Sequence, residues 1–179
     1  MADPACSAED RLRPIETVLM QTSHPGNIGS TARALKTMGL SRLCLVDPLR
    51  FPDPEATALA SGAEDLLDQA RVVATLPEAL AQARLVFGSS DRRRGIRMLE
   101  IGPREFARLA LDAAAVGPVA VLYGTERTGL TNEELELCQY LVTIPANAEY
   151  SSLNLASAVQ VLSYELRQEA LSRTTAEPD

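Results

Sequence analysis

The chain has 179 residues, of which 46% are hydrophobic and 23% charged, which is enough for one well-buried domain and too little for two. No apolar run approaches the ~20 residues of a membrane span, and the polar, charged start is unlike a signal peptide. A net charge of −7 argues against broad binding of nucleic acid through phosphate contacts, although basic residues gathered in one loop could still hold RNA locally.

Short β-rich runs alternate with helical patterns, which predicts an α/β domain around a mainly parallel sheet with helices on both faces. In chain order we expect a strand at Ile15–Met20, a helix at Ile28–Met38, a strand at Leu43–Val46, a helix at Ala63–Gln69, a strand at Arg71–Ala74, a helix at Leu76–Ala83, a strand at Leu85–Phe87, a helix at Pro103–Ala115, a strand at Val119–Tyr123, a helix at Asn132–Cys138, a strand at Leu141–Ile144 and a helix at Leu153–Leu171. No repeat or linker divides them. Residues 14–172 should therefore form one domain, between a disordered lead-in at 1–13 and a disordered tail at 173–179.

Local signals predict some of the boundaries. Asn27 should cap the first helix and Gly39 should end it, because Asn satisfies free N–H groups at a helix start and Gly favours the helix exit. Phe51–Ala60 is rich in Pro and then in Ala, and no helix or strand is assigned to it. Residues 89–102 have no periodicity, and loops of about 14 residues in compact domains are usually functional or disordered.

Three of the expected strands end in small or polar residues, at Gly88–Asp91, Gly124–Glu126 and Ile144–Asn147. Ligands of parallel sheets bind beyond the carboxyl ends of the strands, and glycine lets a ligand approach the backbone closely. We therefore expect a binding pocket at this edge. The sequence has neither a Gly-x-Gly-x-x-Gly fingerprint nor a Walker loop, so an ordinary dinucleotide site and an NTPase are not favoured.

The segment Glu149–Ala156 combines a polar Tyr-Ser-Ser turn with an Asn in the first turn of a long helix. Ser is a good helix cap, whereas Asn is a poor helix former because its side chain competes for backbone hydrogen bonds. A well-capped helix and a polar functional site explain these residues equally well.

Three polar clusters, Ser23–Arg33, Tyr123–Glu133 and Asn147–Leu155, together resemble the three motifs of the SPOUT-superfamily RNA methyltransferases, most closely those of the TrmJ type. The resemblance covers about Ile15 to Arg167. It implies a C-terminal trefoil knot, S-adenosylmethionine as cofactor, and methylation of a ribose 2′-hydroxyl of tRNA, at cytidine or uridine 32 of the anticodon loop. It also implies a homodimer, and relatives with a further C-terminal segment, so that this chain would be an isolated catalytic domain.

The resemblance also carries site roles over to matching positions. The implied cofactor contacts are Ser89, Ser90, Asp91, Gly124, Ile144, Ser151, Ser152 and Leu153. Arg33 is the implied catalytic residue; since arginine keeps its proton at neutral pH, it should hold a phosphate or stabilise the developing alkoxide, while a role as base stays open. Asn27, Glu126 and Asn154 would shape the substrate site, although Glu126 is equally explained as a structural carboxylate paired with Arg127 or Arg33.

Arg92, Arg93, Arg94 and Arg97 concentrate positive charge beside the expected cofactor loop. They are candidates for contacts with tRNA phosphates, although such a run equally describes a solvated surface. With no Trp and three Phe, the chain offers little base stacking. Two other functions stay open: a non-catalytic RNA- or nucleotide-binding module on the same fold, and methylation of a ribose in ribosomal RNA.

Metal and disulfide chemistry find little support. Cys6, Cys44 and Cys138 are widely separated, no Cys-x-x-Cys pair exists, and His24 is the single histidine. We therefore expect neither a zinc site nor a disulfide framework, and expect reduced thiols in a cytoplasmic protein. A lone histidine also argues against a Ser-His-Asp hydrolase.

Overall fold

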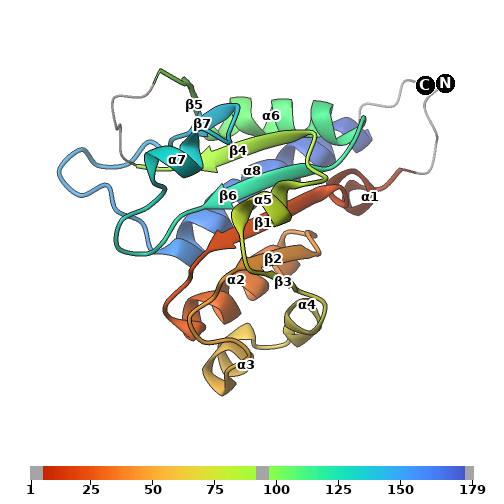
Figure 1. The fold of residues 1–179 in the computed structure, drawn as a ribbon. Helices are drawn as coiled ribbons and strands as arrows, with labels where there is room; N and C mark the ends of the chain where they lie inside the picture. Colours follow the sequence, from red (N-terminus) through yellow and green to blue (C-terminus); the bar gives the residue numbers. More distant parts are fainter. Residues whose placement is uncertain (1–5, 92–96, 176–179) are drawn as a thin grey trace.

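The computed structural model describes residues 6–91 and 97–175. Within them a seven-stranded sheet, parallel throughout, has the strand order β3-β2-β1-β6-β4-β7-β5 (Figure 1). The strands are β1 (Ile15–Met20), β2 (Arg42–Val46), β3 (Arg71–Val73), β4 (Leu85–Ser89), β5 (Leu99–Ile101), β6 (Val119–Tyr123) and β7 (Tyr140–Val142). The expected parallel α/β class is confirmed.

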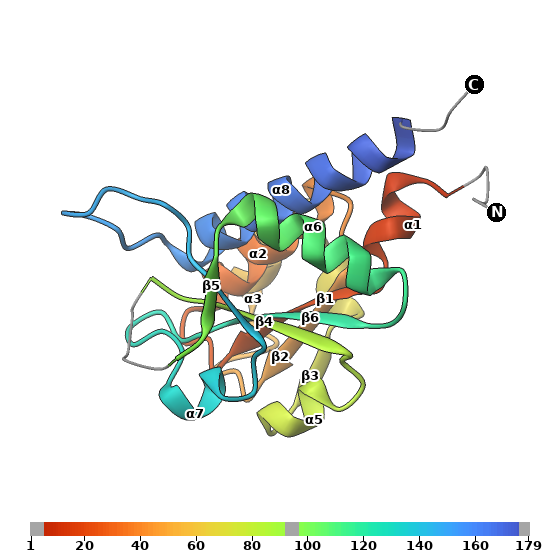
Figure 2. The ribbon, with the colours of Figure 1, turned by 90° about the horizontal axis from the view of Figure 1, so that it is seen from above.

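Helices cover both faces of this sheet, also as expected (Figure 2). The helices of one face are α1 (Ala8–Leu12), α2 (Pro25–Thr37), α6 (Pro103–Ala114) and α8 (Leu155–Thr175), with α3 (Pro54–Ala60) and α4 (Glu64–Asp68) packed against α2. The helices of the other face are α5 (Leu76–Leu80) and α7 (Asn132–Leu135). None of the helices in the described ranges combines the length and apolarity needed to cross a bilayer.

The central strands are buried on both sides. Along β1, Ile15 and Leu19 belong to the larger core beneath α2, α6 and α8, whereas Val18 and Met20 belong to the smaller core beneath α5 and α7. Successive side chains of a strand point to opposite faces, so every position of β1 is apolar or buried. This is why a central parallel strand reads as a continuous apolar run.

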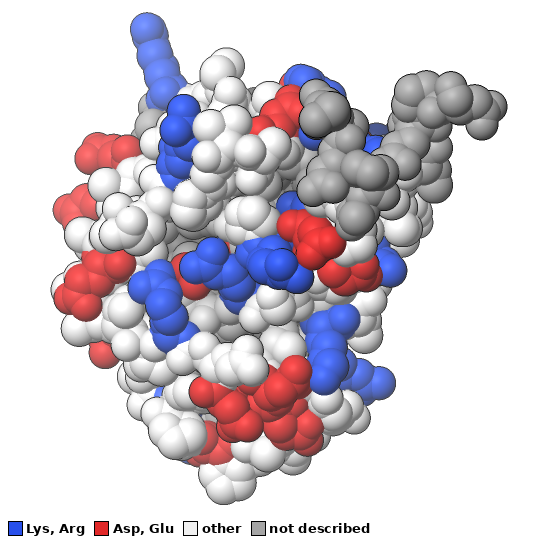
Figure 3. All heavy atoms as spheres, turned by 90° about the vertical axis from the view of Figure 1, so that its right-hand side faces the viewer, with Lys and Arg blue, Asp and Glu red and all other residues white. Residues whose placement is uncertain are grey.

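Opposite charges are mixed at the amino ends of the strands, on the face shown in Figure 3. There Glu16, only 8% exposed, accepts two hydrogen bonds from the Arg71 guanidinium at 2.7 and 3.2 Å. Arg42 Nη2 lies 3.9 Å from the same carboxylate. These contacts tie β1, β2 and β3 together at the end opposite the polar loops that the sequence singles out.

Residues 8–12 and 173–175, which were predicted to be disordered, are helical. Ser7 and Asp10 form a reciprocal capping box that starts α1, and Leu12 is completely buried, so the disordered lead-in is wrong for residues 8–12. Arg167 of α8 donates to Glu9 Oε1 at 3.0 Å, which holds α1 in place. Helix α8 continues to Thr175, so the predicted disordered tail is wrong for residues 173–175.

Of the two predicted boundaries of α2, the start is wrong and the end is confirmed. The predicted cap at Asn27 is wrong, because the helix begins at Pro25 with His24 in the N-cap position. Proline suits the first helical position, where its missing N–H costs nothing. The predicted end is confirmed: Met38 is the C-cap, and Gly39 follows with φ of +81°, a conformation that glycine adopts without strain.

Besides α1, two short elements were not predicted from the sequence. Asp53 caps α3 by accepting from the Glu55 N–H at 2.9 Å, within the Pro- and Ala-rich stretch. Helix α3 lies so close to α2 that a Cβ on Gly29 would be 2.1 Å from the Ala56 carbonyl oxygen. Strand β5 lies in the stretch read as a loop, and β7 is the strand with which it pairs among the described residues.

Candidate functional site

A cavity of about 350 Å³ opens at the carboxyl ends of β4 and β6, which is the edge where the sequence predicts a pocket. All eight expected cofactor residues line it: Ser89, Ser90, Asp91, Gly124, Ile144, Ser151, Ser152 and Leu153. The three expected substrate residues Asn27, Glu126 and Asn154 line it too. The structure therefore brings together side chains from four loops that are distant in sequence.

Hydrogen bonds connect the three polar clusters across this cavity. Asn27 Nδ2 donates to Glu126 Oε2 at 3.3 Å, and Asn154 Nδ2 donates to Asn27 Oδ1 at 3.2 Å. Asn154 Oδ1 in turn accepts from the Ala156 N–H at 2.9 Å. These side-chain hydrogen bonds thus form one network that connects the loop after β6, the start of α2 and the start of α8.

Glu126 is the central hydrogen-bond acceptor of this network. Its carboxylate accepts from the Ser23 N–H at 3.0 Å, the Ser23 hydroxyl at 2.9 Å and the His24 N–H at 2.9 Å, besides Asn27. Burial alone would raise the pKa of Glu126, but these hydrogen bonds outweigh it and hold the pKa below its ordinary value. The expectation of a structural carboxylate is supported, with donors from the start of α2 in place of an arginine.

The loop after β6 turns back sharply on itself. Thr125 and Gly129 form an isolated antiparallel bridge, and Gly129 has φ of +67°. A Cβ added to Gly124 would lie 2.2 Å from the Gly129 carbonyl carbon. Only glycine fits at this point of the cavity wall.

The start of α8 combines the two interpretations that the sequence left open. The residue that caps the helix is Asn154, through its bond to the Ala156 N–H. Ser151, Ser152 and Leu153 are exposed and line the cavity. The turn therefore serves as a helix start and as one wall of the site.

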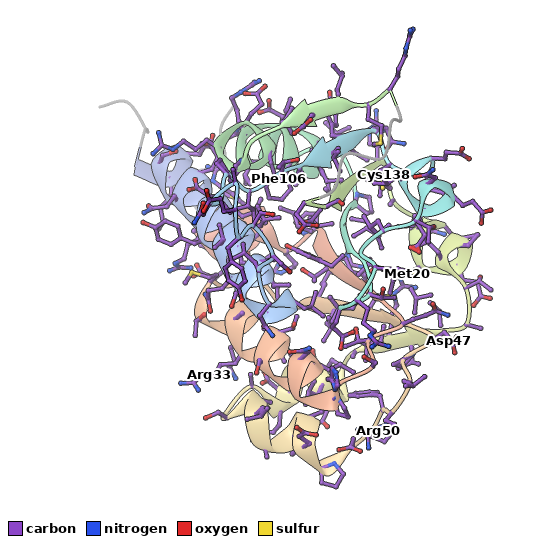
Figure 4. The ribbon with its side chains drawn as sticks, turned by 90° about the vertical axis from the view of Figure 1, so that its left-hand side faces the viewer. Met20, Arg33, Asp47, Arg50, Phe106 and Cys138 are labelled. Atoms are coloured by element: carbon purple, nitrogen blue, oxygen red, sulfur yellow. The ribbon has the colours of Figure 1, made fainter. Side chains whose placement is uncertain are left out.

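Arg33 does not line the cavity. It is exposed, and in Figure 4 its side chain points outward from α2, away from the body of the protein. Asn27 and Arg33 lie six positions apart on one helix, so their side chains leave it in directions about 120° apart. Arg92, Arg93 and Arg94 lie outside the described residues, and Arg97 is exposed.

Among the cavity residues that were not predicted as site residues from the sequence are His24 and Tyr123. His24 lines the cavity next to Asn27 and Glu126, and its imidazole does not cap α2. Tyr123, 3% exposed, lies at the end of β6 in the cavity wall, and burial raises the pKa of its phenol well above the ordinary range. The sequence feature that could have pointed to His24 and Tyr123 was their position, because His24 directly precedes the helix and Tyr123 directly precedes Gly124.

The cysteines lie elsewhere. Cys44 and Cys138 are buried, and burial raises the pKa of their thiols to about 11 and about 12. Both are therefore poor nucleophiles at neutral pH. Among the described side chains, no group of three or more His, Cys, Asp or Glu is arranged to hold a metal ion.

Comparison with known proteins adds four findings. Residues 14–164 match the model of the SpoU rRNA Methylase family. A tRNA (cytidine/uridine-2'-O-)-methyltransferase TrmJ from Sodalis glossinidius is 56% identical over 156 residues, which are 87% of this chain and 61% of that protein. The crystal structure of TrmJ from Z. mobilis superposes with a TM-score of 0.82 and 38% identity, covering 86% of this chain and 68% of that one. The SpoU methyltransferase AviRb from Streptomyces viridochromogenes, in complex with AdoMet, has a TM-score of 0.71 and 25% identity, covering 91% of this chain and 64% of that one.

Proposed function

The chain belongs to the SpoU methylase family, and on that premise we propose that it transfers a methyl group from S-adenosylmethionine to a ribose 2′-hydroxyl of tRNA, at cytidine or uridine 32 of the anticodon loop. Residues 14–172 form the catalytic domain, and a cytoplasmic location goes with this function. The chain spans 61% of the length of its TrmJ relative from Sodalis, so the activity of the longer protein is carried over here only as a proposal.

The observation that carries the proposal is the convergence of the three polar clusters on one cavity. Ligand pockets of proteins have volumes of about 300 Å³ upward, and this one of about 350 Å³ suits one nucleoside-sized ligand. Its wall joins apolar groups, Ile144 and Leu153, to the hydroxyls of Ser89, Ser90 and Ser152. This combination suits an adenosine with a charged amino-acid tail.

Each part of the wall receives a role under this proposal. Ser89, Ser90, Gly124, Ile144 and the turn 151–153 hold the cofactor, and the Asp91 carboxylate favours its positive sulfonium. When bound, S-adenosylmethionine supplies an electrophilic methyl group. The protein contributes mainly alignment of the 2′-oxygen with that group, which can account for most of the rate gain. The hydrogen bonds among Asn27, Glu126 and Asn154 fix the positions of the cavity walls relative to one another.

Arg33 acts in this proposal from a second copy of the chain. Its guanidinium points away from the cavity of its own chain, yet it is exposed and able to reach another surface. Helix α8 offers exposed apolar side chains, Tyr164 at 48% and Leu171 at 39%, that a homodimer would cover. Across a two-fold axis each chain would supply Arg33 to the other's cavity, where it stabilises the alkoxide or holds a phosphate. Arg92, Arg93 and Arg94 would contact tRNA phosphates beside it.

Mixed dimers test this arrangement. Arg33→Ala and Gly124→Ala should each abolish most of the transfer. An equal mixture of the two variants, unfolded and refolded together, should recover about a quarter of the wild-type rate, because half of the dimers then contain one complete site. No recovery, with dimers present in solution, would show that Arg33 does not act across an interface.

The trefoil knot is also part of the proposal. Strands β4 and β5 follow each other along the chain, yet β7 lies between them in the sheet. The chain therefore returns from β6 into the space between two earlier strands before it continues to α8. That path supports a knotted C-terminal region in this family.

One experiment separates this function from its alternatives. Calorimetric titration with S-adenosylhomocysteine measures the cofactor site, and tritium transfer to unmodified tRNA, followed by mass spectrometry of the product, locates the methylated nucleotide. Binding with transfer to position 32 is the expected result. Binding without transfer to any RNA favours a non-catalytic module, and transfer to ribosomal RNA alone favours the ribosomal alternative.

A further inference from the structure

His24 contributes an imidazole to the wall of the cavity. It is exposed and lines the cavity together with Asn27 and Glu126. Its side chain makes no capping bond to α2 and no other hydrogen bond within residues 6–91 and 97–175. A histidine in the N-cap position that does not cap leaves its ring nitrogens free for a ligand.

The backbone of His24 is held on two sides, although its ring is free. Its N–H donates to Glu126 Oε2 at 2.9 Å, so the loop after β6 fixes its position relative to the cavity wall. Pro25 follows it, and a residue before proline is restricted to extended conformations. His24 has φ of −100° and ψ of 112°, in agreement with that restriction. The imidazole is thus presented to the cavity from a rigid turn.

The other groups around the cavity are poorly suited to accept a proton. Glu126 already accepts four hydrogen bonds, which lower its basicity. Asp91 lies on the side of β4 and is proposed to face the cofactor. Arg33 stays protonated at neutral pH. An efficient general base has a pKa near the working pH, and histidine is the side chain that ordinarily meets this condition.

We propose that His24 accepts the proton of the ribose 2′-hydroxyl during methyl transfer, an inference that rests on the proposed function. As the 2′-oxygen forms its bond to the methyl carbon, the carbon–sulfur bond breaks and its electron pair stays on sulfur. The proton of the hydroxyl passes to an unprotonated ring nitrogen of His24, and the imidazolium then releases it to solvent. No oxidation or reduction occurs. Arg33 and His24 have separate tasks in this scheme, since one stabilises charge and the other receives the proton.

This role predicts the sign of the pH dependence. Within the described residues of one chain, the charged groups that line the cavity with His24 are Glu126 and Arg127 in the loop after β6 and Asp91 after β4. The carboxylate of Glu55, from α3, lies against Gly26. An imidazolium cannot accept a proton, so the rate of the chemical step should fall as His24 becomes protonated at low pH. A histidine that merely held an RNA phosphate would act as a cation, and transfer would then improve at low pH.

The test compares the single-turnover rate at saturating cofactor and tRNA with the ionisation of His24. Because the sequence contains one histidine, ¹³C labelling of histidine isolates its ring Cε1–H resonance from those of tRNA and cofactor, and its titration in the complex with S-adenosylhomocysteine and tRNA gives an independent midpoint. We expect the acid limb of the rate profile to have that same midpoint. His24→Asn should lose the limb and about 100-fold in rate, a typical contribution of a general base, and His24→Gly should regain rate with added imidazole.

Ser23→Ala is the matched control. It removes one hydrogen bond to Glu126 from the same turn but leaves the imidazole in place, so it should lower the rate without moving the acid limb. The inference is overturned if His24→Asn keeps the acid limb, if the two midpoints differ by more than one pH unit, or if low pH accelerates transfer. In each of those cases the unaltered chain still methylates tRNA and the proposed function stands. Absence of transfer by the unaltered chain would overturn both.

Discussion

Substitution of Glu126 by Gln tests whether one carboxylate holds the site together. Oε2 accepts three hydrogen bonds, from the Ser23 hydroxyl, the His24 N–H and Asn27 Nδ2, whereas Oε1 accepts from the Ser23 N–H alone. The amide oxygen of a glutamine should therefore replace Oε2, and its NH₂ group should replace Oε1. One backbone N–H, that of Ser23, would then face another donor.

The cost follows from these contacts. An N–H left without its acceptor costs about 1–3 kcal/mol when buried, and the other three bonds lose their charge assistance, which makes up roughly half of their strength. Because Glu126 is half-buried, solvent offsets part of the loss, and we expect a net destabilisation of about 2 kcal/mol. For a domain of this size that lowers the melting temperature by about 4–8 °C.

Thermal and urea unfolding at two pH values check this expectation. The folded-state pKa of Glu126 is lowered, so its stabilising contribution is complete above the ordinary value of 4.5 and is lost as the pH falls through the lower folded-state value. The difference between wild type and Glu126→Gln should therefore be largest at neutral pH and shrink towards pH 3. Glu133→Gln, at an exposed carboxylate of α7, is the control and should change stability by less than about 0.5 kcal/mol. Equal stability of Glu126→Gln and wild type at neutral pH would refute the anchoring role.

Three further substitutions give distinct signatures. Gly124→Ala places a methyl group 2.2 Å from backbone, so calorimetry should show at least a tenfold loss of S-adenosylhomocysteine affinity, and unaltered binding would contradict the assignment of this wall. Arg33→Ala should leave affinity and the melting temperature unchanged, since Arg33 is exposed outside the cavity, while tritium transfer falls by more than tenfold. Tyr123→Phe removes a hydroxyl from the cavity wall that makes no hydrogen bond to another described residue, so the melting temperature should stay or rise; a fall of several degrees would contradict this expectation.

The parts of the fold that could be predicted are those with strong local signals. Strand β6 is apolar throughout and β1 is apolar at four of its six positions, because both faces of these strands are covered, and Gly39 marks the end of α2 through its backbone conformation. The elements that were missed depend on tertiary contacts. Strand β5 has three residues and is ordered by β7. Helix α1 has five residues, and Arg167, more than 150 positions away, contributes to its stability.

The candidate site likewise has features that could be predicted from the sequence and features that depend on tertiary contacts. The motif resemblance placed Gly124, Asn27 and Asn154 at one cavity, because a motif records which residues meet without stating how. It did not reveal that Asn27 lies inside α2, since Pro25 and not Asn27 starts the helix. Nor did it reveal that Arg33 points away from its own cavity, because the direction of a side chain on a helix depends on how that helix packs against α3 and α8.

The hydrogen bonds that link Glu126, Asn27 and Asn154 also have a consequence for biosynthesis. Asn27 and Asn154 are 127 positions apart, and β1 must wait for β6 to fill its second edge. A nascent polypeptide therefore exposes the Ser23–Arg33 cluster on the ribosome long before the opposite wall has been translated. Domains form as units during synthesis, so cofactor capture should occur only after release of the last helix, and truncated translation products should be unable to sequester it.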